Sequence, residues 1–132
     1  MIKYLLEMFL ISLILTIVIE LVVIWLFSQI SHSMSFIHKK QGVFLVVLVN
    51  VLTNPPAVLI CWIASLYLGN VPAMIVQILT EAVVVVVEAW IYHIFAKEKQ
   101  WDIHNPAILS CVANICSWLC GIALMAVRNI LV

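Results

Sequence analysis

Residues 43–96, VFLVVLVNVLTNPPAVLICWIASLYLGNVPAMIVQILTEAVVVVVEAWIYHIFA, contain two long apolar runs with a short link between them. The runs cover residues 43–68 and 72–96. A helix needs about 20 mainly apolar residues to cross the hydrocarbon core of a bilayer, so each run is long enough. The link 69–72, Gly-Asn-Val-Pro, is a tight turn because glycine can end one helix and proline can begin the next. This stretch therefore predicts two transmembrane helices that run in opposite directions.

Two further apolar runs, residues 4–27 and 106–131, flank this pair. The first is too long for a signal peptide, contains Glu20 and lacks a small-residue cleavage site. Before the last run, Asn105-Pro106 is typical of a helix N-cap followed by proline at the first helical position. We therefore expect one domain, residues 1–132, with an all-α integral membrane fold: a bundle of four transmembrane helices.

The composition supports this class. Of the 132 residues 67% are hydrophobic and 9% are charged, and the mean hydropathy is +1.27. A soluble core of this length could not bury so much apolar surface, which excludes a soluble enzyme and a disordered chain. Six basic residues balance six acidic ones, so there is no basic excess for nucleic acid. The four cysteines show no metal-ligand spacing, and we expect neither a metal nor a cofactor.

The lysines suggest an orientation. Lys39, Lys40, Lys97 and Lys99 lie in the first and third links, while Lys3 and Arg128 lie near the termini. Cytoplasmic loops carry an excess of basic residues. We therefore expect a multi-pass protein of the cell membrane, with both termini outside the cytoplasm.

Each predicted helix carries one stripe of polar and small residues. The stripes are Ser12, Thr16 and Glu20; Asn50, Thr53 or Asn54, Ala57, Cys61 and Ala64; Ala73, Gln77, Glu81, Val84 and Glu88; and Ala107, Ser110, Asn114, Ser117 and Gly121. Their spacing, near 3.5 residues, keeps a seam on one side of a left-handed bundle. Hydrogen bonding between helices is the simplest explanation for Ser12, Thr16, Ser110 and Ser117.

The intramembrane acids are less easily explained. Glu20, Glu88, Asn50 and Asn114 fall at a similar depth, and Glu81 lies nearer the midplane on the same face as Glu88. No basic residue occurs at that depth. A carboxylate in hydrocarbon must take up a proton or meet a cation or water. These side chains either handle positive charge or, when protonated, donate hydrogen bonds across the bundle.

A second unusual feature is the Asn54-Pro55-Pro56 sequence inside the second run. The two prolines lack amide hydrogens and leave the carbonyls of Val51 and Leu52 without helix partners. We expect the second helix to be broken or kinked there, and free carbonyls at such breaks line cation sites in many transporters. The alternative is a tolerated kink in which Thr53 and Asn54 satisfy the backbone.

Two functional hypotheses follow. The first is a small transport protein, or a subunit of a transport complex, that handles a cation, a proton or a small cationic solute. Because four helices rarely enclose a pathway alone, it implies a homo-oligomer or a larger complex. Its candidate binding residues are Glu20, Asn50, Thr53, Asn54, Glu81, Glu88 and Asn114. The alternative is a non-transporting assembly subunit whose polar stripes dock a partner membrane protein. An intramembrane enzyme is disfavoured, since no catalytic residues have suitable spacing.

Overall fold

The computed structural model describes residues 2–31, 40–98, 101 and 103–131. In these residues there are four helices and no strand: α1 (Ile2–Ser31), α2 (Lys40–Tyr67), α3 (Asn70–Ala96) and α4 (Pro106–Leu131). Lys39 and Lys99, which support the predicted orientation, lie outside the described residues, as do the side chains of Lys3 and Arg128. The predicted all-α fold is confirmed.

All four helices are long and apolar enough to cross a membrane. Many of their large apolar side chains point away from the bundle; Ile11, Val71 and Val86, for example, are each about two-thirds exposed or more. A soluble protein would have to leave this surface in water, whereas lipid covers it at no such cost. The fold is therefore that expected of a multi-pass membrane protein.

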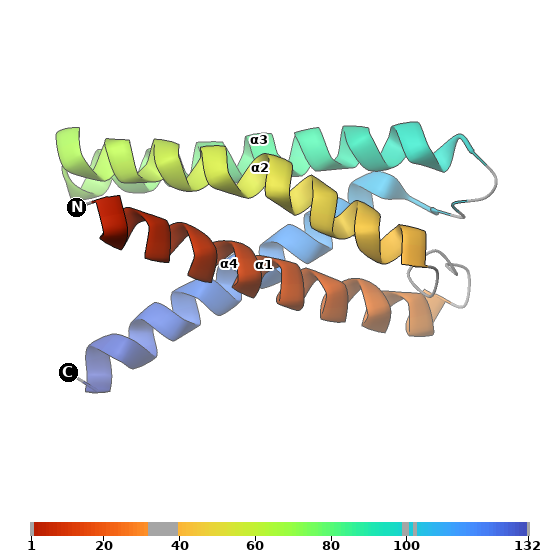
Figure 1. Cartoon of the computed structure of the whole chain (residues 1–132), viewed down its shortest axis with the longest axis horizontal. Coiled ribbons are helices and arrows are strands. Elements are labelled where there is room, and N and C mark those ends of the chain that lie inside the picture. Colours follow the sequence, from red (N-terminus) through yellow and green to blue (C-terminus); the bar gives the residue numbers. More distant parts are fainter. Residues whose placement is uncertain (1, 32–39, 99–100, 102, 132) are drawn as a thin grey trace.

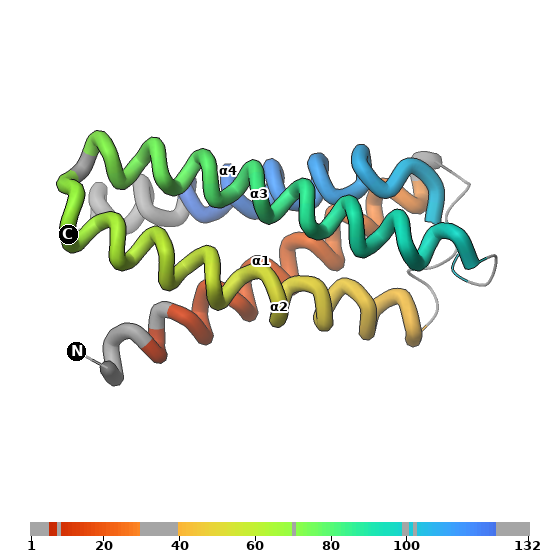
Figure 2. The backbone as a smooth tube through the Cα atoms, turned by 90° about the horizontal axis from the view of Figure 1, so that it is seen from above, coloured from red at the N-terminus to blue at the C-terminus, as the bar shows by residue number. Residues whose placement is uncertain are grey.

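The helices form a closed ring in which sequence neighbours are spatial neighbours. α1 packs against α2 and α4, and α3 packs against the same two helices, while in the described part of the chain the backbones of the diagonal pairs do not approach closely. Successive helices run in opposite directions (Figures 1 and 2). One face of every helix thus points toward a common axis.

The two ends of the bundle differ. We call the end where α2 turns into α3, at Gly69, the turn end, and the opposite end, where α4 begins, the loop end. The start of α1 and the end of α4 lie at the turn end (Figure 1). Both termini are therefore at one end, as expected for four passes, and their location outside the cytoplasm stays a prediction.

The hydrophobic core occupies the loop half of the bundle. It consists of Ile24, Leu45, Val46, Val49, Tyr92, Ile103, Leu109 and Ala113, all buried. Toward the turn end, Ala64 is the one buried apolar side chain of α2 beyond Thr53. Among the side chains that the structure describes, the buried apolar ones are thus concentrated on the loop side of the middle.

The backbone at the two helix starts follows the sequence signals. Gly69 has φ +75° and ψ 179°, a conformation almost restricted to glycine, and α3 begins directly after it. Asn105 has φ 52°, in the left-handed region that asparagine tolerates, and α4 begins at Pro106. Its carbonyl accepts the Leu109 amide at 3.0 Å, which closes the first turn.

The structure does not show the expected break or kink of the second helix, because α2 continues through Pro55 and Pro56. Nor do the neighbouring side chains serve the carbonyls that the prolines leave free. Thr53 donates to the Val49 carbonyl, and Asn54 donates to Thr16 on α1. Val51 and Leu52, whose carbonyls the prolines leave without helix partners, are exposed residues on the outer surface of α2.

Candidate functional site

Six polar side chains meet in the middle of the bundle, next to the hydrophobic core. All four helices contribute to this central cluster, which consists of Glu20, Asn50, Thr53, Glu88, Ser110 and Asn114. None of the six is more than 8% exposed, and both carboxyl groups are fully buried. The polar stripes thus face one another within a single chain. Glu20 and Glu88, which were predicted to lie at a similar depth, belong to the same buried cluster.

Glu88 on α3 has hydrogen-bond partners for both oxygens. Asn114 Nδ2 on α4 lies 2.5 Å from Glu88 Oε2, and Thr53 Oγ1 on α2 lies 2.8 Å from Oε1. Thr53 Oγ1 also lies 3.0 Å from the Val49 carbonyl, so its single proton is shared between two acceptors. The carboxyl group of Glu88 therefore ties three helices together.

A shell of further hydrogen bonds fixes Asn114. Its Nδ2 donates to the Ser110 carbonyl at 3.0 Å, and the Ser110 hydroxyl donates to the Val85 carbonyl on α3 at 2.9 Å. The amide is thereby oriented with its nitrogen toward Glu88. Such a connected network holds a buried acid in one position.

Glu20 on α1 is bound less completely. Asn50 Nδ2 on α2 donates to Glu20 Oε2 at 2.6 Å and to the Val46 carbonyl at 3.1 Å. Glu20 Oε1 and Asn50 Oδ1 are buried and have no hydrogen-bond partner, and the same is true of the Tyr92 hydroxyl, one turn beyond Glu88. Buried oxygens without partners are costly, and each such group needs an explanation.

The electrostatics of the cluster are one-sided. The charge of Glu88 acts on Glu20, and both acids act on the Tyr92 hydroxyl. The basic side chains that the structure describes, Lys40 and Lys97, are exposed and belong to the loop end. No cation in the described part of the chain therefore offsets the two acids.

A second polar row joins α1 and α2 on the turn side of the cluster. Ser12 Oγ donates to Asn54 Oδ1 at 3.3 Å, and Asn54 Nδ2 donates to Thr16 Oγ1 at 3.0 Å. These three side chains are partly buried rather than fully buried. The row continues the seam from the central cluster toward the turn end.

The structure brings together five of the seven predicted candidate residues: Glu20, Asn50, Thr53, Glu88 and Asn114. Asn54 belongs to the second row instead. Glu81 is half-buried and makes no hydrogen bond among the described residues, although its charge reaches Glu20 and Glu88. Their predicted role in binding positive charge stays a prediction.

Two residues of the site were not among the candidates. Ser110 was interpreted as a simple link between helices, but it orients Asn114 inside the cluster. Tyr92 was overlooked, although its position four residues after Glu88 places both on one face of α3. Helical periodicity could have identified both: Tyr92 lies one turn from Glu88 on α3, and Ser110 lies one turn from Asn114 on α4.

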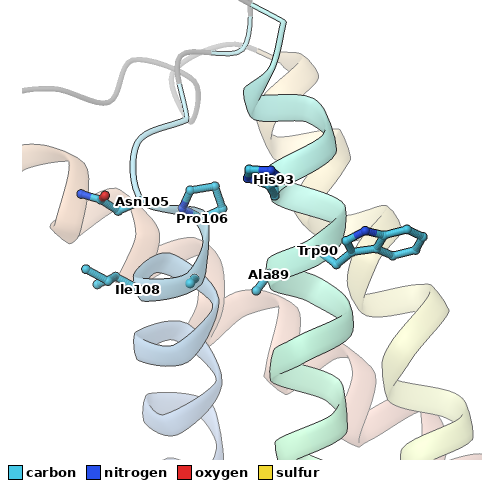
Figure 3. A pocket seen from close by; sticks show the side chains of 7 residues that line it. Ala89, Trp90, His93, Asn105, Pro106 and Ile108 are labelled. Carbon is cyan, nitrogen blue, oxygen red and sulfur yellow. The ribbon is translucent and has the colours of Figure 1, made fainter.

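Other features of the surface are separate from this cluster. An open pocket between α3 and the start of α4 is lined by Ala89, Trp90, His93, Asn105, Pro106, Ala107 and Ile108 (Figure 3). No member of the central cluster lines it. The described residues also contain no group of three or more His, Cys, Asp or Glu side chains that could hold a metal ion.

Comparison with known proteins adds no functional assignment. The chain matches no protein-family model, no curated protein and no solved structure. The inference of function therefore depends on the central cluster and its surroundings.

Proposed function

We propose that this protein is a small membrane transport protein, or a subunit of a transport complex, that handles a cation, a proton or a small cationic solute. The observation that carries the proposal is the pair of fully buried carboxyl groups, Glu20 and Glu88, without a described cation beside them. Ionisable groups at such depth are costly, and in membrane proteins they mark ion pathways and proton relays. A cation or proton that binds reversibly would neutralise these carboxyl groups, which have no permanent basic partner among the described residues.

The unpartnered oxygens support the same function. Glu20 Oε1, Asn50 Oδ1 and the Tyr92 hydroxyl are all buried without a hydrogen-bond partner. A purely structural network would be expected to satisfy such groups. Oxygen atoms of this kind accept a proton or bind a hard cation.

The alternative, an assembly subunit, is less well supported. It requires polar stripes that are available to a partner helix. In this chain, Asn50 binds Glu20 and Asn114 binds Glu88, so the stripes use their polar groups on one another. The lipid-facing surfaces of the helices are apolar, so a partner helix could pack against them but would form few hydrogen bonds with them.

Three further features belong to the proposal. The transporting unit is a homo-oligomer or a larger complex in the cell membrane, because four helices rarely enclose a pathway alone. The termini lie outside the cytoplasm. Finally, α2 bends at Pro55-Pro56 when the site opens, because two missing helix hydrogen bonds make this its weakest point.

The test is a flux assay on purified protein in liposomes. Proton movement is followed with a pH-sensitive dye inside the vesicles while Na⁺, K⁺ or a small organic cation is added outside. We expect a cation-dependent pH change that is abolished by Glu20→Gln and strongly slowed by Glu88→Gln. Glu98→Gln, an exposed acid at the loop end, is the matched control and should leave the flux unchanged. Flux that persists in both cluster variants would contradict the proposal.

A further inference from the structure

The two buried acids have different partners, and the difference suggests different tasks. Glu88 faces two side chains that can donate, the Asn114 amide and the Thr53 hydroxyl. Such an environment suits an ionised carboxylate, which accepts hydrogen bonds and donates none. Glu20 instead faces one amide, that of Asn50, which uses its nitrogen and leaves its oxygen unpaired.

The pairing of Glu20 with Asn50 is half of a known arrangement. A carboxylic acid and an amide can form two parallel hydrogen bonds, in which the amide N–H donates to one carboxyl oxygen and the acid O–H donates to the amide oxygen. The first of these bonds is present, from Asn50 Nδ2 to Glu20 Oε2 at 2.6 Å. The two atoms that would form the second, Glu20 Oε1 and Asn50 Oδ1, are both buried and unpartnered. One proton placed on Glu20 Oε1 would supply both.

The surroundings are too closed for a larger ligand. Glu20 and Asn50 are at most 1% exposed, and Tyr92, whose hydroxyl is the third unpaired oxygen, is fully buried. Calcium requires six to eight oxygen ligands, and magnesium requires near-octahedral coordination. Three free oxygen atoms in a closed site fit a single proton much better than a divalent ion or an organic cation.

The two sides of the cluster offer different access. On the loop side, Ile24, Val46 and Leu109 are at most 1% exposed and form part of the apolar core. On the turn side, Thr16 and Asn54 are polar and only partly buried. A proton moves along polar groups and water, not through packed apolar side chains.

Building on the proposed function, we propose that Glu20 is the proton-binding group of this protein, paired with Asn50, and that its proton enters and leaves from the turn end. Glu88 is then a positioning residue that keeps a fixed charge nearby. The titratable groups that act on Glu20 are Glu88 and Glu81, both on α3, and Glu20 in turn acts on the Tyr92 hydroxyl of the same helix. α2 and α4 present amides and hydroxyls at the cluster. Release of the proton leaves two neighbouring carboxylates, which favours entry of a cation in exchange.

The test uses infrared difference spectroscopy of the protein in liposomes, because a protonated carboxyl has its own C=O stretching band. We expect a band that disappears on going from acidic to alkaline buffer and that is missing in Glu20→Gln. Gln in place of Glu20 supplies the missing donor to Asn50, so this variant should fold and should resemble the protonated form. Glu98→Gln, at an exposed acid of the loop end, is the control and should retain the titrating band. A band that persists in Glu20→Gln and is lost in Glu88→Gln would overturn the assignment.

Access is tested separately in a chain whose four cysteines are replaced by serine. A water-soluble thiol reagent should modify Thr16→Cys and leave Ala113→Cys, which lies in the apolar core, unmodified. The reverse pattern would refute entry from the turn end. If the Glu20 band titrates but no flux is observed, Glu20 is the proton-binding group and the proposed transport function is wrong. If flux survives Glu20→Gln, the transport function stands and the assignment of Glu20 is wrong.

Discussion

Replacement of Glu88 by leucine isolates the part of the cluster that holds the helices together. The leucine is similar in volume but can make neither of the hydrogen bonds that Glu88 forms with Thr53 and Asn114. Thr53 keeps the Val49 carbonyl as its acceptor, whereas Asn114 keeps the Ser110 carbonyl and loses the partner of its second N–H. Hydrogen bonds between membrane helices contribute about 0.6–2 kcal/mol each, so two of them predict a loss of about 1–4 kcal/mol.

The measurement is reversible unfolding in mixed detergent micelles, followed by tryptophan fluorescence. Glu88→Gln should unfold almost like the parent, because an amide can accept from Asn114 and donate to Thr53 while Thr53 donates to Val49. Glu81→Leu is the matched control: the same substitution on the same helix, at a half-buried side chain without a described hydrogen bond. If Glu88→Leu is no less stable than Glu81→Leu, or if Glu88→Gln loses as much as Glu88→Leu, the hydrogen bonds do not stabilise the bundle as argued.

Three further predictions use the same unfolding measurement. Asn54→Ala removes two partly buried hydrogen bonds of 3.0 and 3.3 Å, and at the lower end of the usual range, about 0.5 kcal/mol each, it should cost about 1 kcal/mol. This is less than the loss expected for Glu88→Leu, and an equal or larger loss would contradict the ranking. Gly69→Ala meets no atom within 4 Å but must adopt φ +75°, so its cost of about 1–3 kcal/mol comes from the backbone alone. Gly121→Ala, with equal space on helix α4, is its control and should be neutral or stabilising. Replacing both Pro55 and Pro56 by alanine should raise stability, because α2 regains two helix hydrogen bonds, and should slow flux if α2 bends during transport.

The helices themselves were predictable because lipid imposes a simple length rule. The run 106–131 coincides with α4, and the run 72–96 differs from α3 by two residues at its start. The run 4–27 is shorter than α1, which begins at Ile2 and ends at Ser31. Apolar runs mark the part of a helix that lies in hydrocarbon, whereas backbone hydrogen bonding continues into the polar flanks.

The composition of the site was only partly predictable. Periodicity assigns a side chain to a face of its helix, and this was sufficient to select Glu20, Asn50 and Glu88. It treats Glu81 and Glu88 as equivalent, since they are seven residues apart. They differ in the structure because Glu88 lies opposite Thr53 and Asn114, and no such donor faces Glu81 among the described residues. The periodicity of a single helix does not predict which residues of the other helices lie opposite it, because these depend on how the helices pack.

The choice of side chains opposite the two acids explains how a bundle with two buried carboxyl groups can be stable. If both were ionised, like charges would repel in a medium that screens them poorly. If one carries a proton, its partner must accept a hydrogen bond as well as donate one, and an amide such as Asn50 does both. The acid that stays ionised needs donors, and Thr53 and Asn114 supply them to Glu88. The chain thus presents an environment matched to one proton on the two acids. That proton binds at Glu20, because its carboxyl group accepts one hydrogen bond and that of Glu88 accepts two.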